Sequence, residues 1–225
     1  MKISFIYLNF PFWRSEIGKI ALFLGGIDFE NRIISSSEFE RVKKLGRLDD
    51  GTIIPFHQLP CLVVDGITIA QTGGISRFCG KLSGHYPKNN DILAAQIDQF
   101  LDFSTDITVL VAWTGKYDNK LLRITKRKEL SGGELKKKLI MLEKSISKKN
   151  QWILGSNDLG LADIAIWRLM GWLTSGVAEG IPSDLLKDYP KITHVCQSVD
   201  KDPRIIQWIK KTYPKNYNRG IFYFN

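Results

Sequence analysis

The chain has 225 residues, of which 44% are apolar and 24% charged, enough for one large domain or two modest ones that each bury a core. No apolar run approaches the roughly 18 residues of a membrane-spanning helix, so we expect a globular protein without a membrane partner. The three cysteines, Cys61, Cys79 and Cys196, are widely spaced and form no CxxC motif. This argues against a disulfide framework and against a zinc or dithiol site, so we expect no metal.

Much of the formal net charge of +9 lies in lysine-rich segments such as residues 126–128 and 136–138. A nucleic-acid-binding protein would carry such charge on one face, with interleaved aromatic residues. Here Glu129, Glu134 and Glu143 are mixed with the lysines, which favours a solvated helix face and no nucleic-acid partner. A basic surface would also suit an anionic co-substrate.

The first predicted element is a strand over residues 3–8. Asn9, Pro11 and Arg14 end this apolar stretch early, and no small-residue cleavage site follows. We therefore interpret the segment as a strand of the mature protein, not as a signal peptide, and expect a cytoplasmic location.

Helical and β-rich patterns then alternate up to about residue 82. The clearest signal is Asp65-Gly66 between two apolar runs, because this dipeptide supplies the positive φ angles of a two-residue hairpin turn. In chain order we predict a helix over 14–24, a strand over 29–34, a short helix over 37–45, strands over 61–64 and 67–70, and a helix over 72–82.

A polar, turn-rich stretch follows, and beyond it almost everything has helical period. Helical spacing covers residues 92–113, 120–147, 162–173, 192–199 and 204–211. The prediction is an α/β thioredoxin-like N-terminal domain with a mixed four-stranded sheet over 1–82, a linker over 83–90, and an all-α domain over 91–225.

One segment carries a family resemblance. The run Gln58-Leu59-Pro60-Cys61-Leu62-Val63-Val64-Asp65-Gly66, followed by Ala70-Gln71-Thr72, resembles the glutathione-binding segment of cytosolic glutathione transferases. Residues 45–72 are most similar to the tyrosine-type alpha, pi and sigma branch. The resemblance implies glutathione as co-substrate, a hydrophobic electrophile as second substrate, and a homodimer whose helical domain forms the electrophile pocket and the dimer interface.

The resemblance also implies a cis Leu59–Pro60 bond, whose bend would expose the backbone of Leu59 to an extended peptide. The alternative is a trans proline that starts an edge strand. Gln71 and Thr72 match the helix start that binds the γ-glutamyl carboxylate, since a helix N-terminus offers free N–H groups. The alternative for Thr72 is a plain helix cap.

Other positions match further glutathione contacts of the family. Gln58 matches a side chain near the cysteinyl part of the tripeptide. Lys44 and Arg47 lie close to the position of the cation that binds the glycine carboxylate, and they could equally be solvated surface charges. Asp106, the last of three acids spaced four residues apart on one helix face, matches a residue that reaches the glutathione of the partner subunit.

Tyr7 matches the catalytic tyrosine of this branch, and Arg14 resembles the arginine that supplies a positive field at the start of the first helix. A free thiol has a pKa of about 8.5, and only the thiolate is a good nucleophile. A hydroxyl group that donates to sulfur favours the charged form. The alternative for Tyr7 is a core aromatic residue.

The chain departs from the family between these two residues. The family usually has glycine and arginine there, whereas this chain has Phe10-Pro11-Phe12-Trp13 and is one residue longer. We predict that Phe10 and Trp13 form part of the electrophile pocket with Trp113 and the C-terminal tail Phe222-Tyr223-Phe224. Phe56 matches the aromatic key that alpha-like and pi-like dimers insert into the partner subunit.

The leading hypothesis is therefore a detoxifying glutathione transferase, acting by conjugation, isomerisation or peroxide reduction. The alternative is a non-catalytic ligand-binding or protein-interaction module on the same fold. Retention of the matched tyrosine, glutamines, proline and threonine argues against a degenerate site, whereas the altered loop argues for one. The motif around Gly160 and Asp163 resembles a helix start of the family's second domain and indicates fold, not catalysis.

Overall fold

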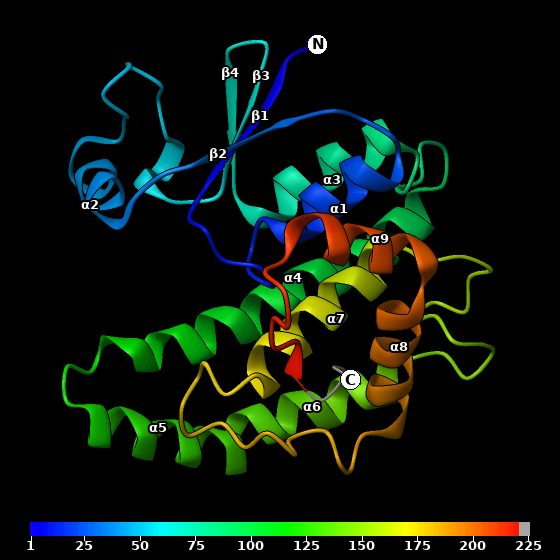
Figure 1. Ribbon diagram of the computed structural model, residues 1–225. Helices are drawn as coiled ribbons and strands as arrows, with labels where there is room; N and C mark the ends of the chain where they lie inside the picture. Colours follow the sequence, from blue (N-terminus) through cyan, green and yellow to red (C-terminus); the bar gives the residue numbers. More distant parts are fainter. Residues whose placement is uncertain (221–225) are drawn as a thin grey trace. The chain divides into compact units, whose positions relative to one another are not determined.

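The computed structural model describes residues 1–220, and the chain divides into two compact units, Met1–Asn90 and Asp91–Asn225. The first unit contains a four-stranded sheet in the order β2-β1-β3-β4 (Figure 1). Strand β1 pairs in parallel with β2 and antiparallel with β3, so the sheet is mixed, as the sequence predicts. Its elements are β1 (Ile3–Tyr7), α1 (Glu16–Leu24), β2 (Glu30–Ile33), α2 (Ser36–Leu45), the 3-10 turn η1 (Pro55–His57), β3 (Cys61–Val64), β4 (Ile67–Ala70) and α3 (Thr72–Ser83).

Strand β1 is buried along its whole length, and its side chains alternate between the two faces of the sheet. Ile6 belongs to an apolar cluster with Val42 of α2 and Ile54. Phe5 lies on the opposite face, where it packs against Gly18 of α1. Helices α1 and α3 pack together there, and α2 lies on the other side of the sheet (Figure 1). The alternation places Tyr7 on the same face as Phe5.

The predicted hairpin is confirmed. Asp65 and Gly66 have φ angles of 47° and 85°, the two positive values that a primed turn requires. The Asp65 carboxylate also accepts a hydrogen bond of 2.7 Å from the backbone N–H of Lys2. The turn therefore fixes the register of β3 and β4 and holds the start of β1 beside it.

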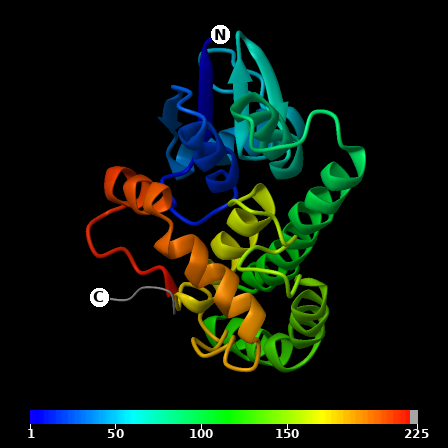
Figure 2. The ribbon, with the colours of Figure 1, turned by 90° about the vertical axis from the view of Figure 1, so that its right-hand side faces the viewer.

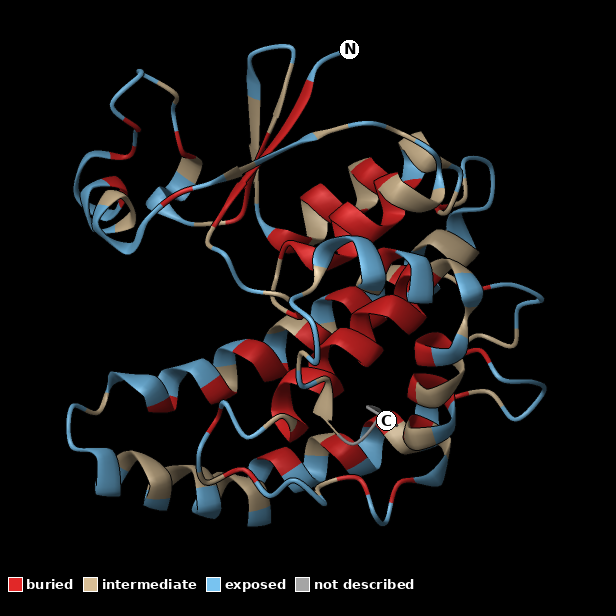
Figure 3. Ribbon diagram, viewed as in Figure 1, coloured by how far each residue is buried: buried red, intermediate tan, exposed pale blue. Residues whose placement is uncertain are grey.

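The second unit is helical over its described residues. Helix α7 is buried at every position and packs against α4 and α8 (Figures 2 and 3). Its N-terminus is fixed by Asp163, whose carboxylate accepts the N–H groups of Gly160 at 2.8 Å and Ile153 at 2.7 Å, which confirms the predicted capping role. Burial raises the pKa of Asp163 to about 6. The elements are α4 (Asp91–Trp113), the 3-10 turn η2 (Thr114–Lys116), α5 (Lys120–Gly132), α6 (Glu134–Ser145), α7 (Leu161–Thr174), α8 (Pro190–Lys201) and α9 (Pro203–Thr212).

One predicted helix is divided in two. The helical spacing over residues 120–147 continues through Gly132 and Gly133, but α5 ends at the first and α6 begins after the second. Gly133 has φ and ψ both near −107°, outside the helical region. Glycine disfavours a helix interior because of its conformational freedom, so the pair breaks the helix despite the continuous apolar pattern.

All three cysteines are free and buried. Burial raises the pKa of Cys61 to about 11 and that of Cys79 to about 12, so their thiols stay protonated near neutral pH. Among residues 1–220, no helix has the length and hydropathy needed to cross a bilayer.

Candidate functional site

The strand registers bring three separate segments of the first unit to one end of the sheet. Ile6 lies opposite Cys61, and Cys61 lies opposite Ala70. Tyr7 follows Ile6 at the end of β1, and Pro60 comes directly before Cys61 at the start of β3. Gln71 follows Ala70 at the end of β4. The sheet therefore places a phenol, a proline bend and a helix start side by side.

Tyr7 is buried, with 4% of its surface exposed, and its carbonyl accepts the N–H of Ile34 at 3.0 Å. Arg14 precedes α1 and is half-buried. Burial lowers the pKa of Arg14 below its usual value, and the nearby Tyr7 acts in the opposite direction. An arginine remains protonated at any physiological pH, so Arg14 contributes a positive charge just before α1.

The longer loop between these residues is fixed by an aromatic side chain that the sequence did not single out. Phe12 is 2% exposed and has a φ angle of 62°. Phe10 and Trp13 lie on either side of it in the chain, with ring centroids 5.0 Å apart. Phe10 is 46% exposed, so the loop presents an aromatic surface while its middle residue is buried.

The Leu59–Pro60 bond is cis, which confirms the prediction. The segment before it is shaped by Phe56 and His57, which both have φ angles between 54° and 58°. The His57 Nδ1 lies 3.1 Å from the carbonyl of Lys43, and its ring lies where a side chain on Gly46 would be. His57 therefore holds the loop on α2, while Phe56 is 69% exposed.

The start of α3 is open to an anion. Its N-cap residue, Gln71, is exposed and makes no side-chain cap hydrogen bond. Its φ and ψ angles of 70° and 128° are unusual for a residue with a side chain. Thr72, buried at 7% exposure, begins the helix, and Gly74 would tolerate an added methyl group without contact. The first amide groups of α3 are thus covered neither by a cap nor by bulky side chains.

Lys44 and Arg47, at the end of α2 and just after it, are exposed and form no ion pair within the described residues. Two neighbouring basic residues, in contrast, form ion pairs. Arg41 pairs with Asp49, and Lys43 pairs with Glu40, each at 2.7 Å. These two positive charges therefore remain available to a ligand. Gln58, which follows η1, is also exposed.

Two predicted residues belong to the second unit, on α4. Asp106 is exposed, as is Asp102 one turn before it. Trp113, at the end of the same helix, is 61% exposed, and the Lys116 ammonium nitrogen lies 3.9 Å from the centroid of its ring. The predicted tail residues Phe222, Tyr223 and Phe224 lie outside the described residues.

Comparisons with known proteins agree with this architecture. A family model described as "Glutathione S-transferase, C-terminal domain" matches residues 105–212. Glutathione S-transferase 1 of Ascaris suum is 26% identical over 202 residues, spanning 86% of this chain and 89% of the relative. The chain is similar to glutathione S-transferases over most of its length. Hematopoietic prostaglandin D synthase of Gallus gallus is 24% identical over 199 residues, spanning 88% and 90%. These relatives fit the tyrosine-type branch of the family.

The fold agrees as well. The solved structure of rat hPGDS complexed with a quinoline matches with a TM-score of 0.78 at 22% identity, covering 96% of this chain and all of the other. The structure of a glutathione S-transferase from Ascaris lumbricoides matches with a TM-score of 0.74 over 96% of this chain. The thioredoxin-like sheet followed by a helical unit is thus the glutathione S-transferase fold.

The chain also carries buried polar residues near the predicted site that the sequence did not indicate. Ser15, Glu16 and Lys19 of the first turns of α1 are each less than 10% exposed. Burial lowers the pKa of Lys19, and the nearby Glu16 acts in the opposite direction. In the sequence, Glu16 and Lys19 are three residues apart and resemble an ordinary solvated ion pair. No sequence pattern therefore indicates that these two residues are buried.

Proposed function

We propose that this chain is a glutathione transferase that activates the thiol of glutathione for attack on an apolar electrophile. The observation that carries the proposal is the meeting of Tyr7, the cis Leu59–Pro60 bend and the uncapped start of α3 at one end of the sheet. The names of the relatives, glutathione S-transferase and prostaglandin D synthase, support the same activity.

The residues present suit the charges of glutathione. The uncapped first turn of α3, with Gln71 and Thr72, would bind the γ-glutamyl carboxylate through amide N–H groups. Lys44 and Arg47, which form no ion pair among residues 1–220, would attract the glycine carboxylate. The backbone of Leu59 would pair with the extended peptide, as an added strand does, and Gln58 would contact its cysteinyl part.

The proposed activation of the glutathione thiol depends on the Tyr7 hydroxyl group. The thiol releases its proton to solvent, and the Tyr7 hydroxyl donates a hydrogen bond to the resulting thiolate. Lowering the thiol pKa by about two units requires about 2.7 kcal/mol of differential stabilisation. One charge-assisted hydrogen bond together with the field of Arg14 supplies energies of that size. The sulfur then forms a bond to an electrophilic carbon, and with an aryl halide a halide ion leaves.

Several finer features belong to the same proposal. The electrophile would contact the aromatic surface of Phe10 and Trp13, and Trp113 would contribute to its binding. The protein acts as a cytoplasmic homodimer in detoxification, with Phe56 as the dimer key and Asp106 reaching the glutathione of the partner subunit. The exposure of Phe56, Asp106 and Trp113 supports these roles, because each side chain is available to a partner or ligand.

The proposal is tested by isothermal titration with glutathione, followed by an aryl-halide conjugation assay on the same sample. We expect binding and turnover together. Binding without turnover would favour a non-catalytic ligand-binding module, since the Phe10–Trp13 loop departs from the family pattern. No binding at millimolar glutathione would contradict the proposed function.

A further inference from the structure

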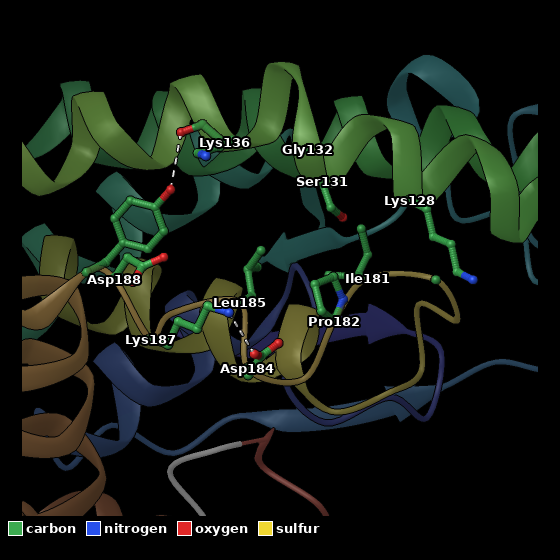
Figure 4. A pocket seen from close by; sticks show the side chains of 12 residues that line it. Lys128, Ser131, Gly132, Lys136, Ile181, Pro182, Asp184, Leu185, Lys187 and Asp188 are labelled. Atoms are coloured by element: carbon green, nitrogen blue, oxygen red, sulfur yellow. Dashed lines mark hydrogen bonds and ion pairs between the residues drawn. The ribbon is translucent and has the colours of Figure 1, made fainter.

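Helix α6 is packed on one side and exposed on the other. Leu135, Leu139 and Leu142 are at most 2% exposed, and they point into the second unit, where α6 packs against α5 and α8. The loop between α7 and α8 passes beneath the start of the helix (Figure 4). There the Tyr189 hydroxyl donates to the carbonyl of Lys136 at 3.5 Å. The exposed side of α6 is therefore held in a fixed orientation.

The exposed side of α6 combines lysines with aliphatic side chains. Lys137, Ile140, Met141 and Lys144 follow the spacing i, i+3, i+4, i+7, which places them together on a helix, and we call these four residues the α6 face. Met141 is 58% exposed and Ile140 is 39% exposed, and both lysines are exposed. Single exposed aliphatic residues are ordinary, but here two adjacent ones form an apolar centre between two lysines.

The acidic residues that lie among these lysines in the sequence do not neutralise the α6 face. Glu143 turns toward α8, where its carboxylate accepts two backbone N–H groups of the first turn, each at 2.9 Å. Glu134 lies 3.9 Å from the Lys137 ammonium, and both side chains are more than half exposed, so solvent screens this pair. Lys144 forms no ion pair among residues 1–220. The positive charge of the face is therefore largely uncompensated.

Further lysines extend this positive charge along the surface. Lys136 precedes the α6 face, and Lys148 and Lys149 follow it in the next loop. All three are exposed, and none forms an ion pair in the part of the chain that the structure describes. A nucleic acid would be attracted by the charge, but it gains most from aromatic side chains on which its bases stack. The α6 face offers aliphatic side chains instead.

We propose that the α6 face binds the surface of a membrane that contains anionic phospholipids. The ammonium groups of Lys137 and Lys144 contact the lipid phosphates, and Ile140 and Met141 enter the boundary between headgroups and acyl chains. Lysines around an apolar stretch are typical of helices that lie in this boundary. A protein bound in this way needs no membrane-spanning helix. The expectation of no membrane partner, drawn from the lack of such a helix, therefore does not bear on it.

The test is co-sedimentation of the full chain with phosphatidylcholine vesicles, with and without about one-third phosphatidylserine, at about 100 mM salt. We expect binding only where phosphatidylserine is present. Lys137→Gln/Lys144→Gln should weaken this binding about 20-fold, since each lysine near an anionic surface contributes about fivefold. The control Lys210→Gln/Lys215→Gln removes the same net charge from exposed residues at the end of α9 and just after it. It should weaken binding less than about twofold.

A further variant separates a membrane from a nucleic acid. Ile140→Ser/Met141→Ser should weaken vesicle binding about fivefold or more but leave any binding to single-stranded RNA unchanged, because only the membrane takes up the two apolar side chains. Absence of wild-type binding, equal weakening by both lysine pairs, or vesicle binding that is unchanged in Ile140→Ser/Met141→Ser would overturn the proposal. All substituted residues are exposed and lie outside the proposed glutathione site. Glutathione conjugation should persist in every variant, so failure of this inference and failure of the proposed function are separable.

Discussion

Gln71 combines a strained backbone with a proposed role in binding glutathione, so a glycine there should separate stability from function. Its φ of 70° and ψ of 128° fall in a region that costs a residue with a side chain about 1–3 kcal/mol. Glycine adopts such angles freely but loses about 0.5–1 kcal/mol through the entropy of the unfolded chain. The exposed side chain makes no cap hydrogen bond, so little else is lost. We expect Gln71→Gly to gain about 1 kcal/mol of stability.

The assay is thermal unfolding together with calorimetric titration of glutathione. A gain of about 1 kcal/mol corresponds to a Tm increase of roughly 2–4 °C for a chain of this size. Loss of a hydrogen bond to a charged ligand should weaken glutathione about tenfold. Gln71→Ala is the matched control, because it loses the same contact but keeps the unfavourable φ, so its Tm should not rise. A Tm that falls in Gln71→Gly, or rises equally in Gln71→Ala, would refute the reasoning.

Three further outcomes follow from the structure. Because the folded pKa of Asp163 is raised to about 6, its contribution to stability is present below its unfolded pKa and lost as the pH rises through 6. In urea titrations, the free energy of unfolding of the wild type relative to Asp163→Asn should fall by about 2 kcal/mol from pH 4.5 to 7. A difference that does not change with pH would contradict this. Gly46→Ala should destabilise the protein by about 2 kcal/mol or more, since the new methyl group would collide with the His57 ring at a φ of 67°; an unchanged urea midpoint would show that the loop adjusts freely. Lys44→Gln/Arg47→Gln should weaken glutathione about tenfold while conserving kcat; a loss of kcat at saturating glutathione would assign these cations to chemistry.

The sequence predicted those elements whose signals are local. Asp65-Gly66 specified the hairpin because few other dipeptides adopt two positive φ angles cheaply. The apolar period continues through Gly132-Gly133 and indicates one helix, whereas the conformational freedom of the two glycines breaks the helix there.

The candidate site was predictable only in part. The segment from Gln58 to Thr72 matches a motif, and the cis bond before Pro60 followed from it. The burial of Phe12 did not, since three aromatic residues in one loop do not reveal which of them points inward. The uncompensated charge of the α6 face was also hidden, because Glu143 lies among the lysines in the sequence, and its hydrogen bonds to α8 depend on a distant segment.

The central claim, that the Tyr7 hydroxyl stabilises the glutathione thiolate, is tested most directly by ultraviolet difference absorbance of bound glutathione as a function of pH. In the wild type we expect the thiolate to persist about two pH units below the pKa of about 8.5 for a free thiol. In Tyr7→Phe the apparent pKa should return toward that of the free thiol, while glutathione still binds. The same low thiol pKa in both proteins would contradict the account and move the activating role away from Tyr7.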